Sequence, residues 1–146
     1  MNWPSPSYSP ATKLFYVQAK EDQGQVFYKL KPNEEPGENY EGGGTRNLLG
    51  AEPYGVVKAI EPTTGKVVWE FRETTSSNSA VLTTASGLLF SGTREGQFFA
   101  LDAKSGAPLW RFTTGGQIHG GPVTYLVDGK QHVAVAAGQG LFVFAQ

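Results

Sequence analysis

The sequence predicts an all-β fold, a partial β-propeller of antiparallel four-stranded blades. Residues 58–71 recur about forty residues later as residues 99–112, with Ala, an acid, Gly, Trp and Phe in register. Short β-forming segments alternate with turns along most of the chain. A period of this length, with one strand-turn-strand unit per copy, is typical of propeller blades. Because 146 residues are too few to close a ring of such blades, we expect an open arc.

The first blade is expected within residues 1–75. Its four strands are predicted at residues 7–9, 14–19, 56–60 and 66–71. The segment 20–51 interrupts them with a long polar loop that contains Pro32, Pro36 and Gly42-Gly43-Gly44. One apolar stretch, residues 26–30, is a candidate strand within this loop. The glycine triplet lacks the lysine and helix of a phosphate loop, so we interpret it as a flexible loop.

The second blade is expected over residues 76–116, and an incomplete last blade over 117–146. Strands are predicted at residues 80–84, 88–91, 97–101 and 109–112, and then at 122–125, 132–136 and 141–144. The pair Asp128-Gly129 predicts a two-residue hairpin turn. Residues 142–145 stand where 98–101 stood in the preceding blade. We therefore expect three strands in the last blade and an unpaired edge there.

Four kinds of residue recur at the same places in the two complete copies. They are Ala59, Glu61, Gly65 and Trp69 in one copy, and Ala100, Asp102, Gly106 and Trp110 in the other. The acid can accept hydrogen bonds from turn amides, and the glycine supplies a positive φ. The tryptophan, on the outermost strand, can lie across to the next blade and still satisfy its indole N–H. We favour this structural role over stacking on a cofactor, because a repeated residue serves the repeat.

Composition excludes several functions. The formal net charge is −1 with the two signs interspersed, so nothing predicts binding to nucleic acid or anionic lipid. No apolar run is long enough for a membrane span, and the first residues do not resemble a secretory signal. The absence of cysteine excludes disulfides and thiolate metal sites within these residues.

The titratable residues do not predict a catalytic or metal centre of the chain's own. His119 and His132 have no partner at metal-ligand spacing. His132 is expected at a core or interface position, and His119 in a connection that faces one end of the propeller. The acids Glu21 and Asp22 lie in a segment expected to be solvated. We therefore predict no metal ligands and no catalytic residue among these residues.

The ordered set of segments resembles the C-terminal part of the quinoprotein alcohol dehydrogenases, which depend on pyrroloquinoline quinone (PQQ). The pattern Ala-x-Asp-x-x-x-Gly-x-x-x-Trp over residues 100–110 is similar to that family's tryptophan-docking motif, and residues 59–69 resemble a degenerate copy with Glu as the acid. Residues 2–10 look like the family's Asn-Trp-Pro start of a late blade. Residues 120–138 look like the end of the family's propeller.

The resemblance implies an eight-bladed periplasmic propeller that oxidises small alcohols with PQQ and a calcium or lanthanide ion. It places part of the cofactor rim at Asn2, Trp3, Asn78, Gly140 and Leu141. Asn2 matches the asparagine that donates a hydrogen bond to the reactive edge of the quinone. Asn78 and the Gly140–Leu141 turn depart from the methanol-oxidising members, which have tryptophans there.

The same resemblance assigns the metal ligands and the catalytic base to other blades. We therefore expect PQQ to bind only when those blades are present, and the isolated chain to be inactive. A non-catalytic propeller-repeat scaffold or assembly module is the alternative. The open edge at Leu141–Ala145 also predicts pairing with the remaining blades or with another copy of the chain.

Overall fold

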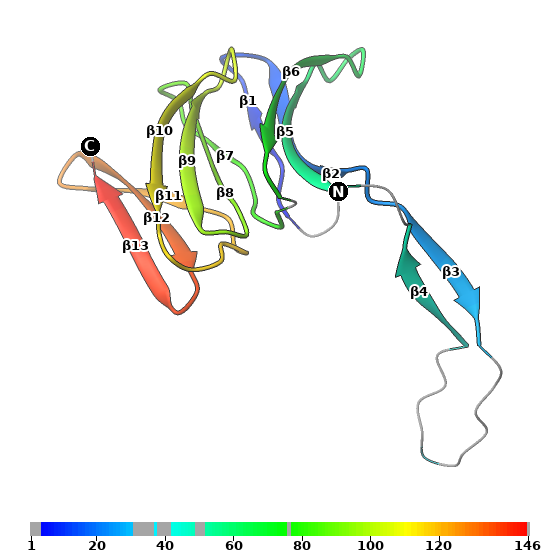
Figure 1. The fold of residues 1–146 in the computed structure, drawn as a ribbon. Helices are drawn as coiled ribbons and strands as arrows, with labels where there is room; N and C mark the ends of the chain where they lie inside the picture. The colour runs from blue at the N-terminus through cyan, green and yellow to red at the C-terminus, as the bar shows by residue number, and fades with distance from the viewer. Residues whose placement is uncertain (1–3, 31–36, 38–41, 49–51, 76, 146) are drawn as a thin grey trace.

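The computed structural model describes residues 4–30, 37, 42–48, 52–75 and 77–145. Every regular element in these residues is a β-strand, and every pair of adjacent strands is antiparallel. The strands form three main sheets that stand one after another along an arc, with the third sheet at one end (Figure 1). The predicted all-β fold, a partial propeller that is not closed, is confirmed.

The first blade has the strand order β1-β2-β5-β6. Its strands are β1 (Ser7–Ser9), β2 (Leu14–Glu21), β5 (Tyr54–Ile60) and β6 (Val67–Glu73). The second blade is a meander of β7 (Leu82–Thr83), β8 (Leu88–Gly92), β9 (Gln97–Asp102) and β10 (Pro108–Thr113). The third blade contains β11 (Val123–Val127), β12 (Lys130–Ala137) and β13 (Gly140–Ala145).

Turn chemistry accounts for how the strands are joined. Asp128 and Gly129 have φ angles of 49° and 78° between β11 and β12, as a two-residue hairpin turn requires. Gly65 and Gly106 have φ angles of 73° and 74° in the equivalent turns of the first two blades. These positive values favour glycine, because a side chain would clash with the backbone.

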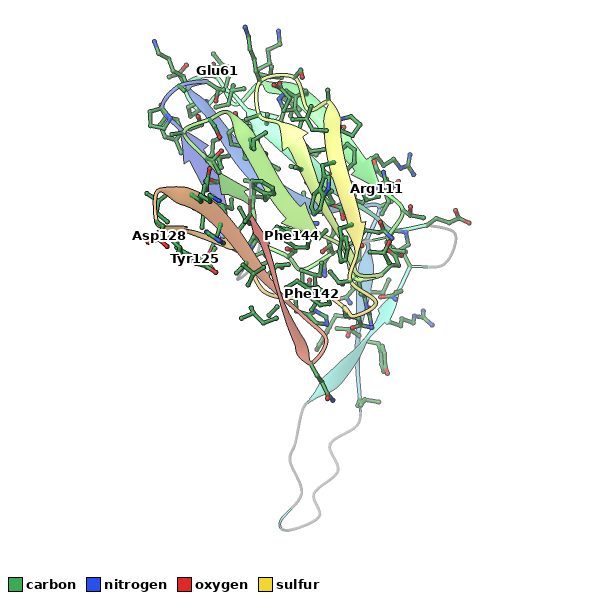
Figure 2. The ribbon with its side chains drawn as sticks, turned by 90° about the vertical axis from the view of Figure 1, so that its left-hand side faces the viewer. Glu61, Arg111, Tyr125, Asp128, Phe142 and Phe144 are labelled. Atoms are coloured by element: carbon green, nitrogen blue, oxygen red, sulfur yellow. The ribbon has the colours of Figure 1, made fainter. Side chains whose placement is uncertain are left out.

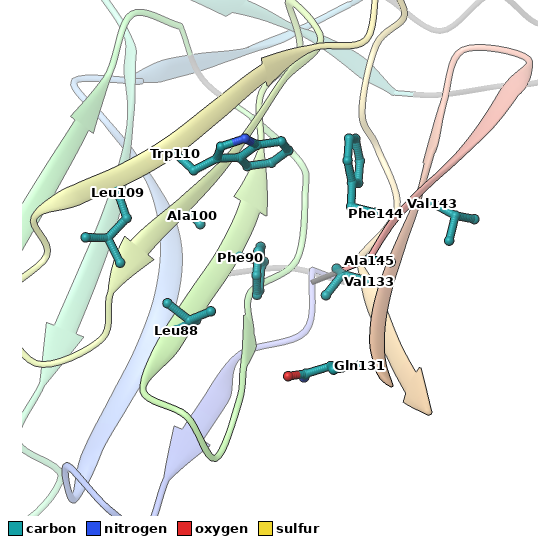
Figure 3. Close-up of a pocket in the computed structure, with 10 residues that line it drawn as sticks. All are labelled: Leu88, Phe90, Ala100, Leu109, Trp110, Gln131, Val133, Val143, Phe144 and Ala145. Atoms are coloured by element: carbon teal, nitrogen blue, oxygen red, sulfur yellow. The ribbon is translucent and has the colours of Figure 1, made fainter. Parts of the chain in front are cut away.

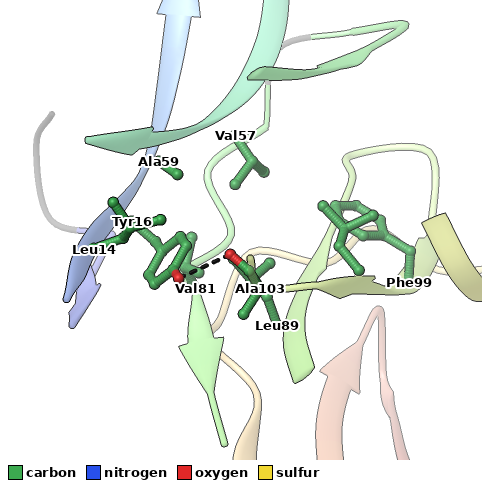
Figure 4. Packing of buried hydrophobic residues seen from close by; sticks show 9 residues of the cluster. Leu14, Tyr16, Val57, Ala59, Val81, Leu89, Phe99 and Ala103 are labelled. Carbon is green, nitrogen blue, oxygen red and sulfur yellow. Dashed lines mark hydrogen bonds between the residues drawn. The ribbon is translucent and has the colours of Figure 1, made fainter. Parts of the chain in front are cut away.

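Apolar side chains fill the space between successive blades. The first interface, between the first and second blades, buries Leu14, Tyr16, Val57, Ala59, Val81, Leu89, Phe99, Leu101 and Ala103 (Figure 4). Trp69 and Phe71 pack against this cluster. The second interface, between the second and third blades, buries Phe90, Phe98, Ala100, Ile118, Val133, Val135 and Ala137. Phe142 and Phe144 of β13 pack against this second cluster (Figure 2). A blade therefore buries its apolar faces only against its neighbours.

The segment expected to be a flexible loop contains a hairpin. Strands β3 (Gln25–Lys29) and β4 (Gly43–Asn47) pair and project away from the three blades (Figure 1). The expected strand at 26–30 is confirmed, but the flexible-loop interpretation is wrong for Gly43 and Gly44. A Cβ at Gly43 would lie 2.6 Å from Cζ of Phe27, and one at Gly44 would lie 2.6 Å from the Tyr28 hydroxyl. The aromatic rings cover the glycines, so a strand forms despite their weak β propensity.

Candidate functional site

Four connections meet at one end of the blades and form what we call the rim, residues 77–79, 92–96, 114–121 and 137–140. The Ser77 hydroxyl donates to the Gly92 carbonyl at 2.7 Å, and the Ile118 amide donates to the Thr93 carbonyl at 3.2 Å. The Gly138 amide donates to the Gln117 carbonyl at 2.9 Å. These bonds run from one blade to the next, so they hold the rim as one continuous surface.

Glycines let the rim backbones approach closely. A Cβ at Gly116 would lie 2.7 Å from the Gly138 backbone nitrogen. A Cβ at Gly121 would lie 2.7 Å from Cβ of Ala80. No atom lies within 4 Å of a Cβ built at Gly120, so this part of the rim faces open space. The tight packing explains why this end of the chain is rich in glycine.

Asn78 lies in the part of the rim between the first and second blades. Its neighbours Ser77 and Ser79 are buried, with 2% and 0% of their surfaces exposed. The Ser79 amide donates to the Ser77 hydroxyl at 3.0 Å, and the Ser79 hydroxyl contacts the Gly120 carbonyl at 3.2 Å. Asn78 itself is half-buried, and its side-chain amide makes no hydrogen bond to another described residue. Among the described residues, the Asn78 amide donor thus has no partner, and the segment that carries it is anchored on both sides.

Of the other predicted rim residues, the structure describes two and leaves two outside the described residues. Gly140 and Leu141 begin β13 at the same end of the third blade, directly after the Gly138 contact, and Leu141 is 71% exposed. Asn2 and Trp3 lie outside the described residues. The structure therefore brings Asn78 and the Gly140–Leu141 turn to one end of the arc and leaves the role of each as a prediction.

The histidines lie apart from each other. His119 is exposed on the rim, with Nε2 2.8 Å from the Gln117 side-chain oxygen. His132 stacks on Tyr125 with ring centroids 5.4 Å apart. Among the residues that the structure describes, no three His, Asp or Glu side chains gather where they could hold a metal ion. None of the described segments is a helix that could cross a membrane.

Trp69 packs against the turn that follows β9 in the second blade. Its indole N–H donates to the Ala103 carbonyl at 3.2 Å. The Tyr16 hydroxyl donates to the same carbonyl at 2.9 Å, as Figure 4 shows. A Cβ at Gly106 would lie 2.6 Å from the indole Cε3, so only glycine admits the ring. Asp102 holds the turn through the amides of Lys104 and Ser105, at 3.1 and 2.8 Å.

Both acids of the repeat have lowered pKa values. Hydrogen bonds from the Ser105 hydroxyl and amide lower the pKa of Asp102. In the first blade, hydrogen bonds from the hydroxyls of Thr63 and Thr64 lower the pKa of Glu61 to about 2. Each carboxylate is thus ionised at neutral pH and organises its turn.

Trp110 has different surroundings from Trp69. It borders an apolar cavity of about 620 Å³ between the second and third blades (Figure 3). Its ring meets Phe144 edge-on at 4.9 Å and is 39% exposed. Its indole N–H has no hydrogen bond to a described residue, whereas that of Trp69 does. The described residues end at Ala145, and they contain no turn after β13 equivalent to the one that receives Trp69.

One buried charged residue was missed by sequence reasoning. Glu73, at the end of β6, is 5% exposed and accepts hydrogen bonds from Nε2 of Gln18 at 3.0 and 3.1 Å. Burial raises the pKa of Glu73 to about 8, and the nearby Glu95 carboxylate adds to this effect. Alternation along β6 could have revealed it, because Trp69, Phe71 and Glu73 share the face that packs on the second blade.

Comparison with known proteins identifies the family. The chain is 39% identical over 140 residues to a quinoprotein ethanol dehydrogenase of Pseudomonas putida and 41% identical over 143 residues to one of Pseudomonas aeruginosa. Each match covers 95% of this chain. The chain belongs to the quinoprotein alcohol dehydrogenase family of β-propellers. It spans about a fifth of the length of these family members, 22% in both cases.

Solved structures agree with this membership. A europium-containing methanol dehydrogenase matches 90% of this chain and 24% of its own, at 34% identity and a TM-score of 0.80. The quinohemoprotein alcohol dehydrogenase of Comamonas testosteroni matches 96% of this chain and 22% of its own, at 29% identity and a TM-score of 0.76.

The chain also resembles the outer membrane protein assembly factor BamB. A family model described as outer membrane protein assembly factor BamB matches residues 53–146. BamB from Moraxella catarrhalis matches 95% of this chain and 45% of its own, with a TM-score of 0.52 but only 16% identity. This likeness shows a shared propeller fold alone.

Proposed function

We propose that this chain is the C-terminal propeller segment of a quinoprotein alcohol dehydrogenase and forms part of the rim of its PQQ site. The observation that carries the proposal is the match to quinoprotein ethanol dehydrogenases over 95% of the chain but only 22% of theirs. The geometry supports it, because the arc of blades is not closed and the Asn78 amide on the rim makes no hydrogen bond to another described residue.

One edge of PQQ would face the rim. Asn78, with Asn2, Trp3, Gly140 and Leu141, would line that edge, and the open space at Gly120 leaves room beside it. PQQ accepts the electrons of the alcohol when bound. An amide that donates to a quinone oxygen stabilises the negative charge that reduction builds there.

The described residues do not fit the calcium or lanthanide ion. No suitable cluster of carboxylates and histidines exists among the described residues, so we assign the calcium or lanthanide ligands and the catalytic base to other blades. The isolated chain would then bind no alcohol productively and would be inactive. By the same family reasoning, the complete protein would act on small alcohols in the periplasm.

We also propose how the arc joins the rest of a ring. Residues 1–75, 76–116 and 117–146 would be three successive blades, with Ala59–Trp69 and Ala100–Trp110 as tryptophan-docking motifs. The exposed apolar side chains Val123, Leu141 and Val143 of the third blade would be covered by the remaining blades, or by another copy when those are absent.

A chimera tests the proposal. This chain replaces the corresponding segment of the Pseudomonas putida quinoprotein ethanol dehydrogenase, and PQQ affinity is measured by spectroscopic titration of the apoprotein. We expect Asn78→Ala or Asn2→Ala to weaken PQQ binding by about tenfold, the effect of one lost charge-assisted hydrogen bond. Asn47→Ala, on the exposed β4 strand, is the matched control and should change nothing.

A scaffold or assembly module is the second candidate, favoured only by the assembly-factor family model. It predicts that the chimera neither binds PQQ nor responds to substitution of either rim asparagine. Such indifference would refute the dehydrogenase proposal.

A further inference from the structure

A buried polar network lies beneath the rim, at the first interface. It begins at the Glu73 carboxyl, which ends β6 and accepts both bonds from Nε2 of Gln18 on β2. The Gln18 side chain is 5% exposed and its oxygen lies 3.2 Å from the Ser91 hydroxyl on β8. Three strands from two blades thus contribute one side chain each.

The network continues directly into the segment that carries Asn78. The Ser91 hydroxyl also contacts the Ala80 carbonyl at 3.0 Å, so its single proton is shared between Ala80 and Gln18. One residue further along β8, the Gly92 carbonyl accepts the Ser77 hydroxyl. The rim segment 77–79 is therefore held through Ser77 itself and through Ala80, which follows it, and Glu73 anchors the chain that precedes it.

These contacts fix the position of the Gln18 side chain between the first and second blades. The Gln18 amide contacts Glu73 through its nitrogen and Ser91 through its oxygen, so one buried side chain links β6 to β8. An apolar contact would bury the same interface, but it lacks the directional hydrogen bonds that hold these three strands in one arrangement. Burying a carboxyl costs free energy, and the Glu95 carboxylate adds a like charge nearby, so Glu73 does not simply stabilise the blade pair.

We propose that the Glu73–Gln18 pair is a positioning device that holds rim segment 77–79, and with it Asn78, in the geometry that receives the cofactor. The proposal rests on the proposed function for its purpose. The positioning itself can be measured in the absence of PQQ. Glu73 and Gln18 act through the rim segment and contact no substrate or cofactor.

Amide hydrogen exchange of the apoprotein tests the positioning. Glu73→Ala and Gln18→Ala should speed exchange of the Ser79 amide, which donates to Ser77, by about tenfold or more, because the segment loses its anchor. Glu73→Gln keeps an acceptor for Gln18 and should restore slow exchange. Glu70→Gln, on the opposite face of the same strand and paired with Lys58, is the control and should leave the rim unchanged.

The pattern of exchange separates positioning from general stability. Faster exchange confined to residues 77–79 supports the proposal. Equal acceleration at the buried β9 amides of Ala100 and Leu101 would mean that the pair only holds the blades together, and would overturn it. No change at Ser79 in either alanine variant would overturn it as well.

PQQ titration of the chimera tests whether the positioning affects cofactor binding. We expect Glu73→Ala to weaken PQQ binding about as much as Asn78→Ala does, and Glu73→Gln to stay within about twofold of the parent. Unchanged PQQ affinity in Asn78→Ala would overturn the proposed function while exchange at Ser79 still decides the positioning role. Loss of affinity in Asn78→Ala but not in Glu73→Ala would overturn the positioning role alone.

Discussion

The first interface is filled at the place where the second interface is open. In the first blade, Tyr16 and Trp69 flank Ala59 in one cross-strand row, and both side chains donate to the Ala103 carbonyl of the second blade. In the second blade, Phe90 and Trp110 flank Ala100 in the equivalent row and line a cavity of about 620 Å³. The same row of residues thus meets a turn in one case and empty space in the other.

The difference shows that the tryptophan alone does not make the contact between blades, because the next blade must supply the groups that receive it. Its burial and its hydrogen bond depend on a carbonyl and a glycine from the next blade, which the first interface supplies at Ala103 and Gly106. In the described residues the second interface supplies aromatic contacts from Phe144 instead. A blade therefore gains its full stabilisation only from its neighbour.

The largest expected effect is a difference in stability loss between substitutions of the two tryptophans. Trp69→Ala should lower the free energy of unfolding by about 4 kcal/mol, because it leaves a large cavity and removes one of the two hydrogen bonds to the Ala103 carbonyl. Trp110→Ala should cost about half as much, because the ring is 39% exposed and already borders a cavity. Urea denaturation of the chain measures both. Equal losses would mean that the two interfaces are energetically alike.

The second prediction uses the buried carboxyl, which only the first interface contains among the described residues. With a pKa of about 8 in the folded state against 4.5 ordinarily, Glu73 stays protonated in the folded chain while the unfolded chain ionises. The contribution of Glu73 to stability is largest below about pH 4.5 and should fall by about 1.4 kcal/mol per pH unit as the pH rises toward about 8, where the loss is complete.

Glu73→Gln should remove this slope, so the variant gains on the parent by about 3 kcal/mol between pH 5.5 and 7.5. Unfolding measured at three pH values in that range checks it, with Glu70→Gln as the control. A pH-independent difference between Glu73→Gln and the parent would show that Glu73 ionises normally.

The third prediction compares two glycines with the same backbone conformation. Gly65→Ala should cost about 1 kcal/mol, because its φ is 73° but no atom lies within 4 Å of the new Cβ. Gly106→Ala should cost about 2 to 3 kcal/mol, because the new Cβ also meets the Trp69 ring at 2.6 Å. Combining Gly106→Ala with Trp69→Ala should erase the excess, and additive losses would argue against the contact.

The smallest effect comes from a single hydroxyl. Tyr16→Phe makes the first interface resemble the second, where Phe90 occupies the equivalent place. It removes the hydroxyl's bonds to the Ala103 carbonyl and to the Thr12 side chain. It should cost about 1 kcal/mol, since Trp69 still donates to that carbonyl and the Thr12 hydroxyl is only partly buried. Tyr8→Phe, at a half-exposed tyrosine, is the control and should be neutral within about 0.5 kcal/mol. Thermal unfolding of both variants measures the difference.

The blades themselves were predictable because they rest on local patterns. Strand alternation, turn glycines and the repeat of residues 58–71 at 99–112 specify each blade from short segments of sequence. The hairpin β3–β4 was predicted only in part, since residues 26–30 carried a strand signal. The glycine triplet concealed its partner strand, because the rings of Phe27 and Tyr28 that cover the glycines come from the other strand.

The candidate site was less accessible from sequence. Asn78 was found through a family resemblance, whereas the Glu73–Gln18 pair that lies beneath it was not predicted. Its two members are 55 positions apart, and neither belongs to a motif. Alternation along β6 places Glu73 on the inner face, but only the packed blades reveal the amide that meets it.

The sequence by itself determined the repeat, the strands, the turns and the residues that each blade offers to its neighbour, since all of these depend on contacts between residues close along the chain. Only the tertiary structure decided that Trp69 is covered while Trp110 borders a cavity, and that a carboxyl is buried beneath the rim. Burial, cavity volume and the pKa of an acid depend on atoms brought together from distant strands, and a linear pattern does not contain those distances.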